Sequence, residues 1–209
     1  VTVASASVHT AEIFTSAASG LAHLKFGNVE RRLVIRLAIP GVLGGALGAY
    51  VVVSAPLQWI RPAVSTYLLV LGVLVVVRAF RRPPAVTPVR SDGPLVPLGF
   101  VGGLCDAIGG GGWGPVVTST LVARGNHPRT AIGSANAAEF FVTLAESASF
   151  FMLLGFDHGR LVLGLVLGGV VAAPVAAYVC RRVSPRPLMV AVGIVVILLS
   201  LRGLFLALR

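Results

Sequence analysis

The stretch GGLCDAIGGGGWGPVVTSTLVARGNHPRTAIG, residues 102–133, decides how this chain folds. It begins with an apolar run, breaks at four consecutive glycines (residues 109–112), and resumes with Trp113, Gly114 and Pro115. Inside a helix each glycine costs about 1 kcal/mol relative to alanine, and proline is tolerated mainly in the first turn. The stretch therefore predicts two half-helices that meet at an unwound loop.

The composition around this break is that of a membrane protein. Hydrophobic residues make up 56% of the chain and charged residues only 11%, and the mean hydropathy is +0.93. Several apolar stretches approach or exceed the roughly 18 to 20 residues that cross a bilayer. Soluble α/β proteins alternate such runs with charged surface helices, which this sequence lacks. We expect an all-α polytopic protein of the cell (inner) membrane, in contact with the lipid bilayer.

Charge, cysteines and motifs exclude several other classes. The net charge is +10, but the basic residues form short clusters between apolar segments, so no nucleic-acid partner is expected. Cys105 and Cys180 have no CxxC spacing, and His9 and Glu12 have the wrong order and spacing for a zinc helix. HExxH, GxSxG and Walker motifs are absent. We expect no enzyme, no cofactor and no metal site.

The apolar spans divide the chain into two parts. The prolines and charges of RRPPAVTPVRSDGP, residues 81–94, mark a linker between the regions 1–80 and 95–209. Within the second region, the broken segment should form half-helices at 95–108 and 113–123. Full spans are predicted at 1–24, 37–54, 63–79, 131–154, 160–179 and 187–207.

The two regions are related as repeats. At one constant spacing of 127 residues, Ser7, Glu12 and Phe14 match Ser134, Glu139 and Phe141. The first copy has no counterpart of the glycine-broken segment, which would lie before Val1. We therefore expect a duplication whose first repeat is incomplete at its N-terminus.

The basic residues favour a broken segment that enters the membrane and returns. With residues 95–123 re-entrant, most lysines and arginines fall on one face, which the positive-inside rule makes cytoplasmic. Each half-helix is also too short to span at about 1.5 Å per residue, although a kinked 29-residue span stays open. If the segment is re-entrant, the chain crosses the membrane three times between equivalent positions of the two repeats. An odd number of crossings gives the two repeats opposite orientations, so the repeats are inverted, as in many transporters. The opposite face then holds only Arg61, Arg160, Arg202 and Arg209.

The glycine run has two interpretations. Its glycines could permit close helix packing, or its backbone N–H groups could line a cavity and bind an anion. Four glycines followed by Trp-Gly-Pro break the helix outright, which packing does not require, so we favour the second. The candidate substrate-binding residues are Gly110, Gly111, Gly112, Trp113 and Gly114, with Ser134 and Asn136 as side-chain donors.

Ionisable residues inside the apolar segments are candidates for coupling or gating. Charged groups are costly at membrane depth and usually serve a function there. Glu12 and Glu139 occupy equivalent positions in the two repeats, so a shared structural role competes with a coupling role. For Glu146, a hydrogen bond between two helices competes equally with a coupling or gating role. The candidates are Asp106, Glu139, Glu12 and His9, with protonation of Glu139 or Asp106 as the coupling step.

Two runs resemble a known family. DAIGGGGWGPVVTSTLVARGNHPRTAIGSANAAEFFVTLA and its first-half echo HTAEIFTSAASGLAHLKFGNVERRLVIRLAIPGVLGGALGA are similar to the TauE/SafE permeases, also called the sulfite exporter or TSUP family. The resemblance implies two related halves, each opening with a glycine-rich broken segment. It also implies transport of sulfite, sulfonates or other organosulfur anions. This chain departs from the pattern by lacking the first glycine segment.

Together these features predict a secondary transporter for a small anion that works by alternating access. A passive anion channel is one alternative. A membrane-embedded enzyme or an assembly subunit is another. The sequence makes no prediction of substrate identity, direction of transport or oligomeric state.

Overall fold

A computed structural model describes residues 2–54, 57–81, 94–118, 120–121, 124, 126, 128–155, 159–182 and 184–207. These residues are almost entirely helical, and no strand occurs among them. The all-helical prediction is therefore confirmed. The predicted linker, residues 81–94, lies almost wholly outside the described part of the chain.

Each predicted span corresponds to a helix. Two helices, α2 and α3, begin about six residues before their predicted spans, because hydropathy marks only the part of a helix that lies in hydrocarbon. The early turns of α2 carry exposed arginines, which can reach the polar interface. The helices are α1 (Thr2–Lys25), α2 (Arg31–Ser54), α3 (Leu57–Phe80), α4 (Leu95–Gly109), the π-helical turn η1 (Gly114–Thr118), α6 (Pro128–Leu154), α7 (Gly159–Arg182) and α8 (Pro185–Ala207).

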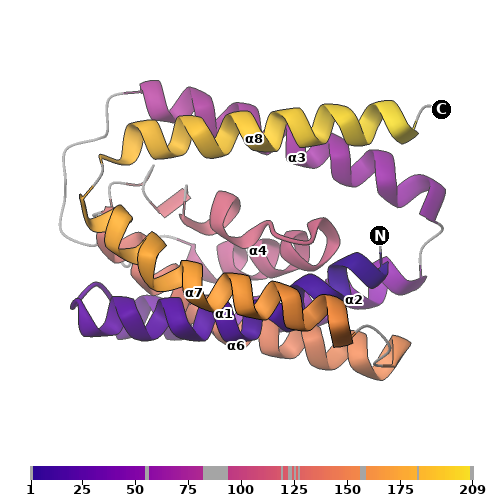
Figure 1. Cartoon of the computed structure of the whole chain (residues 1–209), viewed down its shortest axis with the longest axis horizontal. Coiled ribbons are helices and arrows are strands. Elements are labelled where there is room, and N and C mark those ends of the chain that lie inside the picture. Colours follow the sequence, from indigo (N-terminus) through magenta and orange to yellow (C-terminus); the bar gives the residue numbers. More distant parts are fainter. Residues whose placement is uncertain are drawn as a thin grey trace.

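The helices form two packed groups with α4 between them (Figure 1). In one group α6 packs against both α1 and α2, and α7 packs against α1. In the other, α3 and α8 lie side by side, with Gly72 and Gly193 at their crossing. The main partner of α4 is α2. The broken segment is thus enclosed by helices from both predicted regions of the chain.

Glycines bring the backbones of α2 and α4 into direct contact. A Cβ atom added at Gly44 would run into the carbonyl oxygen of Phe100, and one added at Gly103 would run into that of Gly41. Small residues at such positions let membrane helices approach closely. The close-packing role is therefore real for the glycines of α2 and for those within α4.

The outer surface carries many large apolar side chains. Met152 is 84% exposed, Phe80 74% and Val171 71%. Among the described residues, the helices at Arg31–Ser54 and Arg129–Leu154 are long and apolar enough to cross a bilayer, and several others contain shorter apolar runs. An apolar surface of this extent is unusual for a soluble monomer and fits contact with lipid.

The chain turns back on itself at the glycine run. Val117 lies after the break, yet its side chain fills the position that a Cβ on Gly102, before the break, would take. Leu121 joins Leu95 and Leu98 in one buried cluster. The segments on either side of the glycines therefore run alongside each other as a hairpin.

Trp113 anchors this hairpin and leads to a testable prediction. Its side chain is fully buried, and its indole Nε1–H donates to the carbonyl oxygen of Ala135 at 3.0 Å. Trp113→Phe removes this hydrogen bond and part of a fully buried side chain, so we expect a loss of about 1–3 kcal/mol in the free energy of unfolding. Thermal unfolding in detergent measures it. Phe80→Leu, at an exposed site, is the control, and an equal loss there would contradict the prediction.

Candidate functional site

The glycine loop begins with an abrupt helix end. α4 stops at Gly109, and Gly110 follows in the left-handed region with φ +68°. Gly111 has φ +130°, which residues with a Cβ rarely adopt. The N–H groups of Gly110 and Gly111 donate to the carbonyl oxygen of Asp106 at 2.8 and 3.3 Å. The predicted unwound loop is therefore present, and its conformation requires glycine at these two positions.

The Asp106 side chain holds the loop from within. Its Oδ1 accepts hydrogen bonds from the backbone N–H groups of Gly112 and Trp113, the latter at 2.8 Å. The Asp106 side chain is fully buried. Two of the amides expected to bind a substrate anion are thus occupied in this structure by a carboxylate of the protein itself.

The loop has one packed side and one open side. A Cβ on Gly112 would lie 3.0 Å from the carbonyl oxygen of Cys105 and 3.1 Å from the Tyr67 hydroxyl. A Cβ on Gly111 or Gly114 would meet nothing within 4 Å. Close packing therefore does not explain glycine at positions 111 and 114.

Ser134 and Asn136 connect helices in this structure. The Ser134 hydroxyl accepts a hydrogen bond from the backbone N–H of Glu30 at 2.8 Å, and Asn136 Nδ2 donates to Ser19 Oγ at 2.7 Å. These contacts tie the start of α6 to α1 and to the turn before α2. Among the described residues, the hydrogen-bond partners of these two side chains are Glu30 and Ser19, not the glycine loop.

A buried cluster of ionisable side chains adjoins the loop through Asp106. His9 Nδ1 is 2.8 Å from Glu12 Oε2 and 3.1 Å from Glu146 Oε2. His9, Asp106 and Glu146 are fully buried, whereas Glu12 is 26% exposed. Each of the three buried residues places one nitrogen or oxygen within 4.8 Å of those of the other two. Helices α1, α4 and α6 thus bring their intramembrane charges to one point.

The sequence predicted three members of this cluster and left the role of Glu146 open. His9, Glu12 and Asp106 were expected as coupling residues, and they do come together. The fourth expected residue, Glu139, is half-buried and within electrostatic reach of the other three. Glu146 belongs to the buried centre of the cluster. It lies seven residues after Glu139, and this spacing, which places both residues on one face of a helix, could have predicted its role.

A glycine on α2 makes room for Glu146. A Cβ added at Gly45 would lie 2.6 Å from Glu146 Oε1 and 2.7 Å from its Cγ. The Glu146 side chain therefore lies directly against the α2 backbone. This contact joins residues about a hundred positions apart, which the sequence pattern could not reveal.

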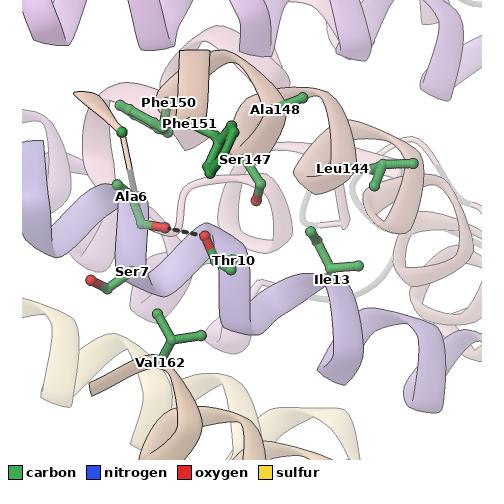
Figure 2. A pocket seen from close by; sticks show the side chains of 11 residues that line it. Ala6, Ser7, Thr10, Ile13, Leu144, Ser147, Ala148, Phe150, Phe151 and Val162 are labelled. Atoms are coloured by element: carbon green, nitrogen blue, oxygen red, sulfur yellow. Dashed lines mark hydrogen bonds between the residues drawn. The ribbon is translucent and has the colours of Figure 1, made fainter. Parts of the chain in front are cut away.

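Figure 2 shows an apolar cavity that shares Phe150 with the surroundings of this cluster. It has a volume of about 470 Å³ and is lined by residues of α1 and α6, together with Gly155 and with Val162 of α7. Its polar groups are the hydroxyls of Ser7, Thr10 and Ser147. Phe150 belongs to its wall and also stacks on the His9 ring, with ring centroids 5.8 Å apart. None of the residues predicted as substrate-binding lines this cavity.

Comparison with known proteins agrees with this architecture. The family model described as "Sulfite exporter TauE/SafE" matches residues 1–203. The chain is 41% identical over 211 residues to a protein of Bacillus subtilis (strain 168) named "Probable membrane transporter protein YtnM", covering 97% of this chain and 70% of that one. No solved structure matches significantly. With its glycine-broken segment and buried charges inside a helical membrane protein, the chain belongs to the sulfite exporter TauE/SafE family.

Proposed function

We propose that this membrane transporter is a secondary permease for small sulfur-containing anions, such as sulfite or sulfonates, and works by alternating access. The family description, which names a sulfite exporter, supports anion transport, and the name of the relative supports membrane transport. The observation that carries the proposal is the glycine loop, which is unwound among helices and open on one side at Gly111 and Gly114. Irregular backbone at membrane depth is tolerated where it is buried in protein or lines a cavity.

In this proposal the anion binds on the open side of the loop. Gly111 and Gly114 let the anion approach the backbone closely, because neither carries a side chain. Gly110, Gly112 and Trp113 set the shape of the loop through their contacts on its packed side. Ser134 and Asn136 complete the site by fixing α6, whose Ala135 carbonyl accepts from Trp113.

The buried charged residues act as the gate. Asp106 bonds to the loop and also belongs to the cluster with His9, so a shift of α1 or α6 relative to α4 would act directly on the loop. Glu12 and Glu139 belong to this gate through their electrostatic interactions with Asp106. The anion site would then be accessible first from one face of the membrane and then from the other.

We further propose that residues 1–80 and 95–209 are inverted repeats joined by the linker 81–94, and that residues 95–123 form a re-entrant hairpin. The helix contacts support this. In the repeat, α1 corresponds to α6, α2 to α7 and α3 to α8. The contact between α2 and α6 therefore has its counterpart in the contact between α7 and α1, and α3 packs against its own counterpart, α8. Gly41 lies against Val142, and Gly169 lies against Thr15; Thr15 and Val142 have the same spacing as Glu12 and Glu139. Transporters of this design alternate access by moving one repeat against the other.

The membrane potential provides the driving force for export. A potential that is negative inside favours expulsion of an anion by about 2.3 kcal/mol per charge per 100 mV. Export from the cytoplasm across the inner membrane would then need no ATP. Saturable flux of labelled sulfite in proteoliposomes would separate this carrier from a passive channel, whose flux does not saturate, and from an enzyme, which forms product without net translocation.

Substitution of Gly111 tests the substrate site. We expect Gly111→Leu to reduce the initial rate of sulfite uptake into proteoliposomes of the full-length protein at least tenfold. The leucine side chain would occupy the open side, and φ +130° disfavours any residue with a Cβ. Gly164→Ala is the control, because it introduces a methyl group into open space on α7. Unchanged transport by Gly111→Leu would rule out the role given to the glycines.

A further inference from the structure

The cluster behind the glycine loop contains polar atoms without partners. His9 Nε2, Asp106 Oδ2 and Glu146 Oε1 are buried, and none has a hydrogen-bond partner among the described residues. Buried polar groups are nearly always paired, so each such atom calls for an explanation. The three residues that carry these atoms each place one ligand atom, either nitrogen in the case of His9 and either carboxylate oxygen in the others, within 4.8 Å of those of the other two.

Charge gives the second reason to look for a ligand here. Asp106 and Glu146 are fully buried, and Glu12 lies at the edge of the same group. Carboxylates that share a site of low dielectric repel one another strongly unless positive charge lies between them, and His9 can supply one positive charge at most for these three carboxylates. A cation would both neutralise the cluster and satisfy its unpaired atoms.

The position of His9 indicates which kind of cation fits. Its Nδ1 is hydrogen-bonded to Glu12 Oε2 at 2.8 Å and lies 3.1 Å from Glu146 Oε2, whereas Nε2 is buried and has no hydrogen-bond partner among the described residues. In metal sites a ligating histidine characteristically donates its other ring N–H to a carboxylate in this way. Imidazole with carboxylates suits divalent first-row ions, whereas Na⁺-like and Ca²⁺-like hard ions prefer oxygen alone.

We propose that His9, Asp106 and Glu146 form a binding site for a divalent first-row metal ion, of the Zn²⁺ or Mn²⁺ class. Three separate helices provide the ligands, and Glu12 orients the imidazole. In a loaded site with metal–ligand bonds of about 2.1 Å, neighbouring ligands lie about 3 to 3.4 Å apart. To reach these separations around Nε2 the side chains would rearrange, because Glu146 Oε2 lies 3.1 Å from His9 Nδ1 in this structure.

Such an ion would connect the cluster to the glycine loop. Asp106 Oδ1 holds the amides of Gly112 and Trp113, while Oδ2 is free to bind the metal. One carboxylate would thus bridge the ion and the loop. The ion would also place positive charge beside a loop that otherwise faces carboxylates. Metal binding itself does not depend on the identity of the transported anion.

Metal titration of the purified full-length protein tests the site. After treatment with EDTA and its removal, Co²⁺ is added as a spectroscopic probe and Zn²⁺ is titrated by calorimetry. We expect one ion per chain, with visible d–d absorption for Co²⁺. His9→Ala, Asp106→Asn and Glu146→Gln should each weaken binding at least 100-fold. Glu12→Gln should weaken it about 10- to 100-fold, as is typical when the partner of a ligating histidine is lost.

The controls separate binding from folding and from transport. Glu30→Gln removes a carboxylate from the turn before α2 and should leave binding unchanged. Asp106→Asn keeps an oxygen for the loop amides, so it should fold even if His9→Ala does not. The proposal is overturned if the wild type shows no saturable binding, or if the three ligand variants bind like Glu30→Gln. Because no substrate is present, failed sulfite transport with intact metal binding would count against the proposed function alone.

Discussion

Replacing Gly44 with alanine should lower the free energy of unfolding by about 3 kcal/mol, and it should prevent α4 from docking normally on α2. The added Cβ would run into the carbonyl oxygen of Phe100 and lie 2.9 Å from its carbonyl carbon. Both atoms belong to the backbone, so no side chain can rotate away and the helices must separate. Overpacking of a tight interior typically costs about 1–3 kcal/mol, occasionally more. Thermal unfolding of the purified protein measures the loss.

The matched control for this change is Gly168→Ala. Gly168 is also a helical glycine, but a Cβ there would meet nothing within 4 Å. Alanine is the better helix former by up to about 1 kcal/mol, so this variant should be neutral or slightly more stable. A similar loss of stability in both variants would mean that the α2–α4 contact is not what requires glycine at position 44.

Replacing Asp106 with alanine should abolish transport and leave the protein about 2–4 kcal/mol less stable than the Asp106→Asn variant. Both changes remove the carboxylate charge, so charge does not contribute to their difference. Asparagine keeps an oxygen that can accept from the amides of Gly112 and Trp113, whereas alanine leaves two buried N–H groups unpaired. Each unpaired group costs about 1–3 kcal/mol.

Thermal unfolding and sulfite uptake, measured on the same preparations, test this prediction. Asp106→Asn should remain folded with an ordered loop. If the alanine variant is as stable as the asparagine variant, Asp106 does not hold the loop, and the loop must be fixed by its packing against Cys105 and Tyr67.

The sequence predicted the helices well because each depends on a local property. Apolar length marked each of the long helices, and glycine with proline marked the break after Gly109, which the structure places at the end of α4. The early starts of α2 and α3 were missed, because a helix continues beyond the hydrocarbon and hydropathy does not report that part.

Part of the candidate site was also predictable. His9, Glu12 and Asp106 stood out because charged groups at membrane depth are costly and rarely incidental. The sequence could not show that Asp106 caps the glycine loop or that Ser134 accepts from Glu30, since the latter pair is 104 residues apart. It also predicted no metal site, because the cysteines have no CxxC spacing and His9 with Glu12 does not fit a zinc helix, whereas the site we propose combines residues of three separate helices.

By itself, the sequence determined that this protein is a bundle of apolar helices interrupted at one glycine loop, because helix propensity and hydropathy are properties of neighbouring residues. Only the tertiary structure decided which polar groups meet. Three helices distant in sequence bring His9, Asp106 and Glu146 together, and Gly45 gives Glu146 the room to lie there. Contacts of this kind depend on how closely backbones approach, and that distance is set by packing in three dimensions.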